Sequence, residues 1–464
     1  MNRRPLRIVQ VAPSDVGGGA EKVAVGLLRE YRNRGHEAVL VVGRKWTAED
    51  AVVQISSSSA WTSSLERCGR ALERHLGPWG RPVRKAVGWV AMPSRMRIFF
   101  FGTGEGDFPE GSRIPEAAGF PPDVLHFHNL HGSDDAYGEY LNPRVLPHLS
   151  RYFPVFLTLH DSWLFTGLCM NPASCANWET GCAKCQDAAA PAGRRTAQAP
   201  RNWSVKRDLL AASRLFVASP SRWMMERALR SILAPAIAGA RVIPNGVDLS
   251  VFCPGGRDNE RSRLGLPLEA LVVLCVACAM RRNLAKDLAL AVDSCRIAAE
   301  TLRSPVLLLV VGDSGRTIRR GLLTVRFCGS VSDSRIIARF YRAADVYLHP
   351  ARVDTFPTTV IEAMACGRPV AATAVGGIPE QIVDGVTGVL APAGDAGAMA
   401  DALVRLLCDS AFRGALGKAA ARAAAERFDV RRQASAYLQW YQEVLTSRET
   451  ARGVTGGDGA PHRH

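Results

Sequence analysis

Short apolar runs alternate with amphipathic stretches along most of the chain. The first apolar run, residues 7–12, is followed by three glycines at residues 17–19 and by a helical pattern over residues 20–34. A second apolar run, residues 38–42, comes directly afterwards. A strand, a glycine-rich turn, a helix and another strand in this order are typical of the start of a doubly wound α/β domain.

The same alternation continues and predicts two such domains. Further strands are predicted at residues 124–128, 155–159, 215–218, 241–243, 271–278, 306–311, 325–327 and 346–348. Apolar strands separated by helices predict mostly parallel sheets that are buried on both faces. We assign residues 1–212 to a first Rossmann-like domain and residues 213–429 to a second, with a helix at about residues 430–448 completing the first. The glycine-rich residues 449–464 are predicted to be a disordered tail.

Residues 56–120 interrupt this regularity and are interpreted as an insertion in the first domain. Within them, residues 65–92 mix several arginines and one lysine with tryptophan, leucine and valine. This composition resembles a basic amphipathic segment that lies on a membrane surface. The alternative is an insertion that packs on its own domain.

Composition narrows the classes of function. The 464 residues carry 58 Lys and Arg against 43 Asp and Glu, a formal net charge of +15. Such a charge favours nucleic acid, an anionic membrane surface or anionic substrates as partners. No nucleic-acid-binding signature accompanies it, so we favour the membrane surface and nucleotide phosphates over nucleic acid. An arginine-rich composition inherited from a high-GC genome is the alternative.

The sequence shows neither the pattern of a signal peptide nor that of a membrane span. The apolar run after the basic start of the chain is too short for a signal peptide, and no stretch reaches the 18 or so apolar residues of a membrane span. We therefore expect a cytoplasmic protein, with peripheral contact to the inner face of the membrane left open. Twelve cysteines in such a protein favour free thiols or a metal over disulfides.

The most informative segment is residues 354–380. Asp354 and Glu362 are eight residues apart, and a helix is predicted to begin at Thr358-Thr359, directly after Pro357. The free N–H groups of such a helix end bind anions such as phosphate. Glu362 lies one turn inside the helix, where it can accept hydrogen bonds from hydroxyls. Phosphate at the helix end and a sugar hydroxyl at the carboxylate together predict a sugar nucleotide as ligand.

The glycine turn after the first strand is a weaker signal. Gly17, Gly18 and Gly19 allow close approach of a ligand to the backbone, and the helix that follows directs N–H groups at it. The dinucleotide fingerprint G-x-G-x-x-G is not completed, because Lys22 occupies its last position. This counts against an NAD-type function.

These features together resemble the retaining nucleotide-sugar glycosyltransferases of the GT-B fold, family four, over about residues 5–445. The family carries two glutamates separated by seven residues; here Asp354 replaces the first and Glu362 is the second. The resemblance implies that Glu362 binds the nucleotide ribose and that Asp354 binds donor-sugar hydroxyls near the reacting carbon. Because Asp is one methylene shorter than Glu, we expect the contact distance to the sugar, and with it the donor preference, to depend on Asp354.

The resemblance also implies residues that act on the diphosphate. Family members carry an arginine and a lysine after the first strand of the second domain, and Arg281 and Lys286 fit this spacing, with Arg282 competing for the first role. Fixed cations stabilise the charge that develops on a leaving diphosphate. Asp287 follows the lysine where the family usually has glycine.

The full set of implied site residues follows from this resemblance. His160, at the end of a strand in the first domain, is expected beside the donor sugar. The catalytic set is His160, Asp354, Arg281 and Lys286. The donor-binding set is Gly18, Gly19, Arg281, Lys286, Phe356, Pro357, Thr358, Thr359 and Glu362. His126, His128 and His131 are interpreted as lining the acceptor cleft, with a metal pair as the less favoured alternative.

Four cysteines cluster after His160. Cys169, Cys175, Cys182 and Cys185 are spaced C-x5-C-x6-C-x2-C, which could wrap a structural zinc ion. Unmetallated thiols and an iron–sulfur cluster are the alternatives. A similar segment marks a subgroup that includes colanic-acid-type exopolysaccharide enzymes. No Asp-x-Asp motif is present, which fits transfer without a catalytic metal.

The predicted protein is thus a hexosyltransferase-type enzyme that moves a sugar from a nucleotide-sugar donor to a polysaccharide or lipid-linked glycan, with retention of configuration. A small-molecule acceptor, as in secondary-metabolite glycosyltransferases, is the first alternative. A nucleotide-sugar 2-epimerase-like enzyme on the same fold is the second. A membrane-associated scaffold that has lost catalysis is the non-enzyme alternative, and the retained Arg281, Lys286 and Glu362 argue against it.

Overall fold

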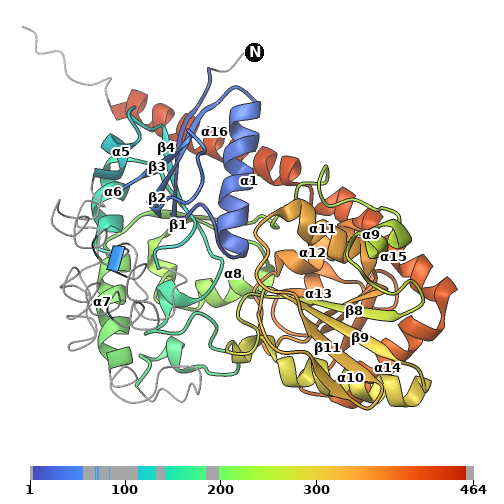
Figure 1. The fold of residues 1–464 in the computed structure, drawn as a ribbon. Coiled ribbons are helices and arrows are strands. Elements are labelled where there is room, and N and C mark those ends of the chain that lie inside the picture. Colours follow the sequence, from blue (N-terminus) through green and yellow to red (C-terminus); the bar gives the residue numbers. More distant parts are fainter. Residues whose placement is uncertain are drawn as a thin grey trace, which may run out of the picture.

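The computed structural model describes residues 4–55, 68, 71, 72, 83, 113–131, 141, 143–183 and 198–455. Within these residues the chain forms two α/β domains that lie side by side (Figure 1). The basic segment predicted at residues 65–92 lies almost entirely outside the described residues. None of the helices in the described part of the chain is both long and apolar enough to cross a membrane.

The first domain is built on a seven-stranded sheet with the strand order β3-β2-β1-β4-β5-β6-β7. Its strands are β1 (Arg7–Ser14), β2 (Glu37–Arg44), β3 (Val52–Gln54), β4 (Val124–Phe127), β5 (Val155–Thr158), β6 (Leu215–Ser219) and β7 (Ile237–Val242). Every neighbouring pair is parallel. The strand order reverses between β1 and β4, and ligands of doubly wound folds bind at the carboxyl ends of strands at such a switch point.

Helices cover both faces of this sheet. They are α1 (Gly19–Asn33), α5 (Ile114–Ala117), α6 (Val145–Tyr152), α7 (Ala199–Ala211) and α8 (Arg222–Leu229), with the short 3-10 helices η3 (Trp163–Phe165), η4 (Asn177–Glu179) and η6 (Ala234–Ala236). In α1, Val23, Leu27 and Tyr31 recur every four residues and are buried against the sheet. This spacing places them on one face of the helix, which is why the predicted helix packs as it does.

The second domain repeats the architecture. Its sheet has the order β10-β11-β9-β8-β12-β13-β14. The strands are β8 (Leu271–Val276), β9 (Val306–Val311), β10 (Ile318–Arg320), β11 (Leu323–Phe327), β12 (Val346–His349), β13 (Val370–Thr373) and β14 (Gly388–Ala391). Only β10 pairs in the antiparallel sense among these described strands. Strand order reverses between β8 and β12, which defines a second switch point.

The helices of the second domain lie on both faces of its sheet. They are α9 (Arg257–Arg263), α10 (Leu288–Leu302), α11 (Ser334–Ala343), α12 (Thr358–Ala365), α13 (Ile378–Gln381), α14 (Ala396–Cys408) and α15 (Ser410–Arg427), with a 3-10 turn η7 (Leu284–Lys286). The predicted end of α12 at Gly367 is confirmed, because Gly367 has a φ of +70° and follows the last helical turn. The strand predicted after it appears as β13.

The domain boundary differs from the sequence-based assignment at residue 213. Strands β6 and β7 pair within the first sheet, so the first domain extends to Val242. The apolar pattern of a buried parallel strand predicts the strand but carries no information on which sheet it joins. The chain crosses to the second domain directly after β7.

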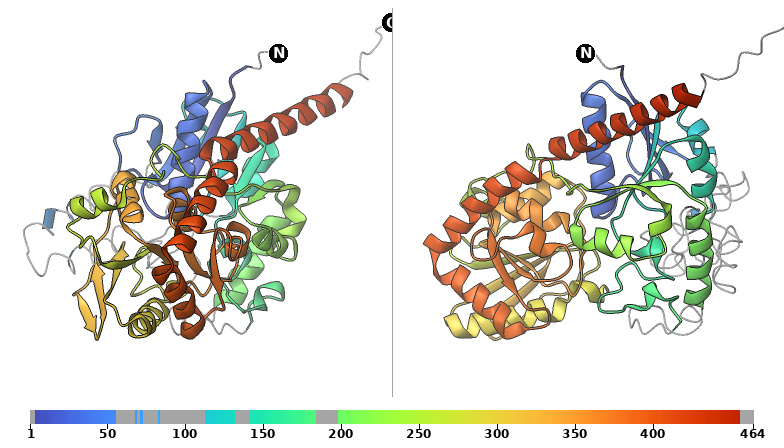
Figure 2. Two further views of the ribbon diagram at one scale, coloured as in Figure 1. Left: turned by 90° about the vertical axis from the view of Figure 1, so that its right-hand side faces the viewer. Right: turned by 180° about the vertical axis from the view of Figure 1, so that it is seen from behind.

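The last helix, α16 (Val430–Thr455), returns to the first domain. Figure 2 shows it running from the second domain across to the first. Tyr437 and Tyr441 are buried in the core of the first domain, and the Tyr437 hydroxyl lies 2.6 Å from Oγ1 of Thr158. The helix continues through residue 455, so residues 449–455 are helical and not part of a disordered tail as predicted; residues 456–464 lie outside the described residues. Both crossings between the domains lie together, because Val247 forms a bridge with Asp429.

Candidate active site

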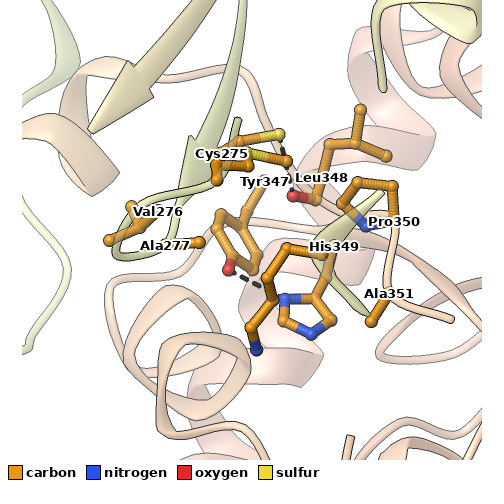
Figure 3. Close-up of a pocket in the computed structure, with 10 residues that line it drawn as sticks. Cys275, Val276, Ala277, Tyr347, Leu348, His349, Pro350 and Ala351 are labelled. Atoms are coloured by element: carbon orange, nitrogen blue, oxygen red, sulfur yellow. Dashed lines mark hydrogen bonds between the residues drawn. The ribbon is translucent and has the colours of Figure 1, made fainter. Parts of the chain in front are cut away.

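A small pocket lies at the switch point of the second domain. It is lined by Cys275, Val276, Ala277, Met280, Lys286, Tyr347, Leu348, His349, Pro350 and Ala351 (Figure 3). These residues come from the ends of β8 and β12 and from the loops that follow them. The pocket therefore occupies the position at which doubly wound domains bind their ligands.

Asp354 is the centre of a three-residue cluster beside this pocket. Its Oδ2 accepts hydrogen bonds from Nζ of Lys286 at 2.5 Å and from Nε2 of His349 at 3.2 Å. Nδ1 of His349 lies 3.1 Å from the hydroxyl of Tyr347, the contact dashed in Figure 3. If Tyr347 donates to Nδ1, the proton of His349 is on Nε2 and points at Asp354.

Electrostatics fix the charge states of this cluster. Burial alone would raise the pKa of Asp354, but the charge of Lys286 and the hydrogen bonds from His349 and Lys286 lower it well below its ordinary range. Burial lowers the pKa of the His349 imidazole, although Asp354 opposes this shift. At neutral pH the cluster is thus a carboxylate that is paired with one ammonium and oriented by one neutral imidazole.

Two glycines hold the Asp354 loop in place. A Cβ on Gly376 would lie 1.8 Å from the carbonyl oxygen of Asp354, and a Cβ on Gly377 would lie 2.0 Å from that of Thr355. Gly376 also has a φ of +58°, where side chains are strained. The amide of Gly377 donates to the Asp354 carbonyl at 3.1 Å. The Gly-Gly turn predicted from the sequence therefore supports the backbone of the acidic residue.

The loop that carries Lys286 is tied to the Asp354 loop. The residue after Lys286, Asp287, has the left-handed conformation with φ 41°, which glycine adopts more readily than aspartate does. The Asp287 carboxylate accepts from the Leu290 amide at the start of α10 and from Nε of Arg352 at 2.8 Å. The left-handed backbone of Asp287 costs conformational energy. The hydrogen bond that caps α10 and the ion pair with Arg352 offset this cost.

Glu362 lies on α12 and is 1% exposed. Its Oε2 accepts from the hydroxyl of Tyr341 at 2.9 Å, and its Oε1 accepts from Nζ of Lys22 at 3.0 Å. Lys22 belongs to α1 of the first domain, so this ion pair spans the two domains. The first turn of α1 reaches the first turn of α12 as well, since a Cβ on Gly19 would lie 3.3 Å from Oγ1 of Thr358.

The start of α12 has the conformation that the sequence predicts. The helix begins at Thr358 after Pro357, and no side chain caps its first turn. The carbonyls of Phe356 and Pro357 accept from the side-chain amides of Asn245 and Gln381, at 3.4 and 3.0 Å. The ring of Phe356 packs edge-on against Phe428 in the core, so this side chain supports the loop from behind.

Arg281 does not join the Asp354 cluster in this structure. Its backbone amide donates to Oδ2 of Asp313 at 2.8 Å, and its guanidinium bonds to Oδ1 of the same carboxylate and to the carbonyl of Ser314. Burial raises the pKa of Asp313, but hydrogen bonds and charge from Arg281 outweigh this and lower it. The side chain of Arg281 is half exposed.

The first domain places His160 in a row of polar side chains. Nε2 of His160 lies 3.2 Å from Nδ1 of His128, whose Nε2 lies 2.9 Å from Oε1 of Gln10. Burial lowers the pKa of His160 to about 4, so its imidazole is neutral at pH 7. His131 pairs with Asp161 at 2.7 Å, next to His160 in the chain. This row follows β4 and β5, beside the switch point of the first domain.

His126 does not line the cleft, contrary to the sequence-based interpretation. It is fully buried, with Nε2 2.7 Å from Oγ1 of Thr158 and Nδ1 2.7 Å from the hydroxyl of Tyr441. The position along β4 explains the difference, because His126 lies inside the strand whereas His128 follows its end. His126 instead joins the core to α16.

The cysteine cluster gives no metal site among the described residues. No three His, Cys, Asp or Glu side chains of the described ranges are grouped as a metal ion would require. Sγ of Cys182 instead accepts from the amide of Gly167 at 3.3 Å. Cys169 and Cys175 are described and half-buried, whereas Cys185 lies outside the described residues. The structural zinc ion stays a prediction from the spacing alone.

Two residues of the site were missed by sequence reasoning. His349 is the last residue of β12 and reads as part of an apolar strand. Lys22 reads as a solvated helix residue. A histidine at the carboxyl end of a strand next to a switch point is a usable signal for the first. No local signal predicts that Lys22 pairs with a residue 340 positions away.

Two doubly wound parallel-sheet domains, with the cations and carboxylates of the second gathered at its switch point, define the GT-B class of fold. The chain belongs to Glycosyltransferase Family 4, whose sequence profile matches residues 17–251, just over half of the chain. A second profile, Glycosyl transferases group 1, matches residues 271–409. The second match contains the pocket, Lys286, Asp354 and Glu362.

Curated relatives resemble part of the chain. A D-inositol 3-phosphate glycosyltransferase from Saccharomonospora viridis is 35% identical over 228 residues, which are 46% of this chain and 52% of the relative. The enzyme of the same name from Acidothermus cellulolyticus is 34% identical over 262 residues, 53% of this chain and 56% of the relative. The chain thus spans about half the length of the curated relatives it matches.

Solved structures resemble nearly the whole chain in fold. Sucrose-phosphate synthase from Thermosynechococcus elongatus has a TM-score of 0.62 at 20% identity and covers 96% of this chain and 100% of its own. Anabaena HepE in complex with UDP and glucose has a TM-score of 0.61 at 18% identity, with coverages of 95% and 100%. At these identities the likeness establishes the shared fold.

Proposed function

We propose that this protein is a glycosyltransferase that transfers a sugar from a nucleotide-sugar donor to an acceptor, with retention of configuration. The observation that carries the proposal is the pairing of Lys286 with Asp354 beside the pocket of the second domain, with Glu362 buried on α12, the helix that follows the Asp354 loop. These residues offer a cation for phosphate and two carboxylates for hydroxyls within one domain. Membership of Glycosyltransferase Family 4 supports the same activity.

Each group has a role in the proposed donor complex. The ribose hydroxyls donate to Glu362, and the diphosphate lies against the uncapped start of α12, where free N–H groups favour anions. Lys286 has three N–H donors, so it can bridge Asp354 and a phosphate oxygen at the same time. Asp354 is held through Oδ2 and presents its other oxygen to a donor-sugar hydroxyl.

The reaction that fits these groups is a same-face displacement. The acceptor hydroxyl oxygen bonds to the anomeric carbon while the bond from that carbon to the diphosphate oxygen breaks. The departing oxygen takes the acceptor proton, so no protein base is required. Lys286 and the amides of Thr358 and Thr359 stabilise the charge that develops on the diphosphate. Because a neutral His160 can hydrogen bond without adding charge, it is assigned to orient the sugar from the first domain.

The acceptor is proposed to be a polysaccharide or lipid-linked glycan that enters over the first domain. The net charge of +15 supports work at the anionic inner face of a membrane. Sedimentation with vesicles of phosphatidylcholine and phosphatidylserine tests this part. Binding that rises with the phosphatidylserine fraction and falls with salt is expected, whereas equal partition to neutral vesicles would contradict it.

A thermal-shift screen against UDP-, GDP- and dTDP-sugars tests the donor, because a ligand of the folded state raises the unfolding temperature. At least one nucleotide sugar should stabilise the protein. Nucleotide release should then depend on added acceptor, apart from slow hydrolysis, and should persist in excess EDTA because cations of the chain replace a metal ion. Conversion of the donor sugar to its 2-epimer without an acceptor would instead identify an epimerase.

A further inference from the structure

The ion pair between Lys22 and Glu362 places a residue of the first domain on the proposed ribose ligand. Nζ of Lys22 lies 3.0 Å from Oε1, and the side chain of Lys22 is 32% exposed while Glu362 is 1% exposed. Lys22 occupies the first turns of α1, on the glycine loop side of the first domain. The contact therefore depends on how closely the two domains approach each other.

Both oxygens of Glu362 are engaged in this structure. Tyr341 donates to Oε2 from the buried helix α11, and its ring packs edge-on against Phe252 and Tyr347. Tyr341 is 0% exposed, so it is fixed in the core. A ribose that binds Glu362 must compete with one of the two partners. Lys22 is the partner that can move, since its side chain is about one-third exposed whereas Tyr341 is fixed in the core.

The displaced ammonium would remain close to the donor. The first turns of α1 and α12 meet at Gly19 and Thr358, where a Cβ on Gly19 would lie 3.3 Å from Oγ1 of Thr358. Two positive helix ends that face each other favour an anion between them. The contact as it stands is too close to admit a phosphate, so donor entry requires this part of the cleft to widen. Widening also separates Lys22 from Glu362.

We propose that Lys22 is a donor-sensing residue with two partners. In the donor-free protein it neutralises Glu362 and holds the domains together at the proposed ribose position. When a nucleotide binds, the ribose hydroxyls replace the ammonium on Glu362, and the ammonium pairs with the diphosphate. This inference rests on the proposed function, because it takes Glu362 as the ribose ligand.

The two roles of Lys22 have opposite effects on two kinds of ligand. For a nucleoside, which has a ribose but no phosphate, Lys22 is only a competitor. For a nucleoside diphosphate, the lost ion pair is replaced by a contact with phosphate. A Lys22→Met variant should therefore bind the nucleoside more tightly and the diphosphate less tightly than the parent protein does. If Lys22 only held the two domains together, its removal would shift the affinities for the nucleoside and for the diphosphate in the same direction.

The experiment measures binding by calorimetry on the full chain. The ligands are the ribonucleosides uridine, guanosine and adenosine and their 5′-diphosphates. Affinities are compared for the nucleoside whose 5′-diphosphate binds the parent protein. For Lys22→Met, the ratio of diphosphate to nucleoside affinity should fall by about tenfold or more, the scale of one hydrogen bond to a charged group. Lys22→Arg should keep most of the ratio. Arg29→Met, on the same helix as Lys22, removes the ion pair of Arg29 with Glu49 and should leave the ratio unchanged.

The outcomes separate this inference from the proposed function. A ratio that is unchanged in Lys22→Met, or two affinities that fall together, would overturn the role of Lys22. The proposed function is tested separately by Glu362→Gln. If that variant binds nucleosides as well as the parent protein does, Glu362 is not the ribose ligand and the proposed donor site is wrong. Thermal unfolding without ligand checks that every variant is folded.

Discussion

The carboxylate of Asp354 accepts hydrogen bonds from Lys286 and from His349 through the same oxygen, Oδ2. A cation and a neutral imidazole thus act on one side of the carboxylate and leave the other side for a ligand. Lys286 contributes a positive charge, whereas His349 fixes the orientation of the carboxylate. The two contributions can be separated by substitution.

His349 is expected to act as a positioning residue. His349→Gln keeps a side-chain donor but loses the rigid link between Tyr347 and Asp354. We expect turnover to fall about tenfold while the KM for the donor changes less, because the orientation of Asp354 matters most in the transition state. Steady-state kinetics with the identified donor measure both parameters. A change confined to thermal stability, with kcat intact, would contradict the assignment.

Asp354→Glu is expected to be harmful even though family members carry glutamate there. The added methylene moves the carboxylate beyond the position at which Lys286 and His349 both reach it, and the two glycines behind the loop leave no room for the backbone to retreat. Turnover with the native donor should fall by about tenfold or more. Comparing several nucleotide sugars tests whether preference changes as well. An unchanged rate with the native donor would show that transfer does not depend on the shorter side chain of Asp354.

Gly376→Ala tests the support of the Asp354 loop. The new Cβ would lie 1.8 Å from the Asp354 carbonyl and would strain a backbone at φ +58°. We expect a loss of unfolding free energy of about 2–4 kcal/mol, together with loss of activity. Gly414→Ala is the control, because a Cβ at this position in α15 has no neighbour within 4 Å. It should be neutral or stabilise the helix by up to about 1 kcal/mol.

Stability should fall as the pH drops from about 6.5 to 4. Burial lowers the pKa of His126 to about 3 and that of His160 to about 4, below the ordinary histidine value of 6.5. In this interval the unfolded chain binds protons that the folded protein does not, so acidification favours unfolding. Each such imidazole contributes up to about 1.4 kcal/mol per pH unit.

Urea unfolding of His160→Asn against the parent protein measures this effect. The variant should lose less stability than the parent between pH 6.5 and 5, because one of the uncharged imidazoles is gone. Parallel pH profiles of the two proteins would mean that His160 is protonated in the folded state at these values. That result would also remove the argument for a neutral His160 in the cleft.

The sequence predicts local parts of this molecule well. Residues 354–380 predict the helix start at Thr358, its end at Gly367 and the glycine turn, because each depends on neighbours in the chain. Both α/β domains follow from the spacing of apolar runs for the same reason. The sheet to which β6 and β7 belong did not follow, since every buried parallel strand has a similar composition.

The partners of charged residues are the part that the sequence could not predict. Lys286 pairs with Asp354 and Arg281 pairs with Asp313, and no motif in the sequence relates either cation to its carboxylate. The pair of Lys22 with Glu362 depends on how the two domains face each other. Such contacts depend on how distant segments pack in the folded protein. The residue types within one segment do not predict this packing.

The rate of sugar transfer by Lys286→Ala tests the central claim most directly. If Lys286 stabilises the leaving diphosphate, kcat should fall by about 100-fold or more. Removing the partner of the buried Asp354 also lowers the unfolding temperature, so the rate is measured at a temperature at which the variant is fully folded. Lys418→Ala, at an exposed lysine of α15, should retain the parent rate. A Lys286→Ala protein that transfers sugar at the parent rate would contradict the assignment of this site as the donor site.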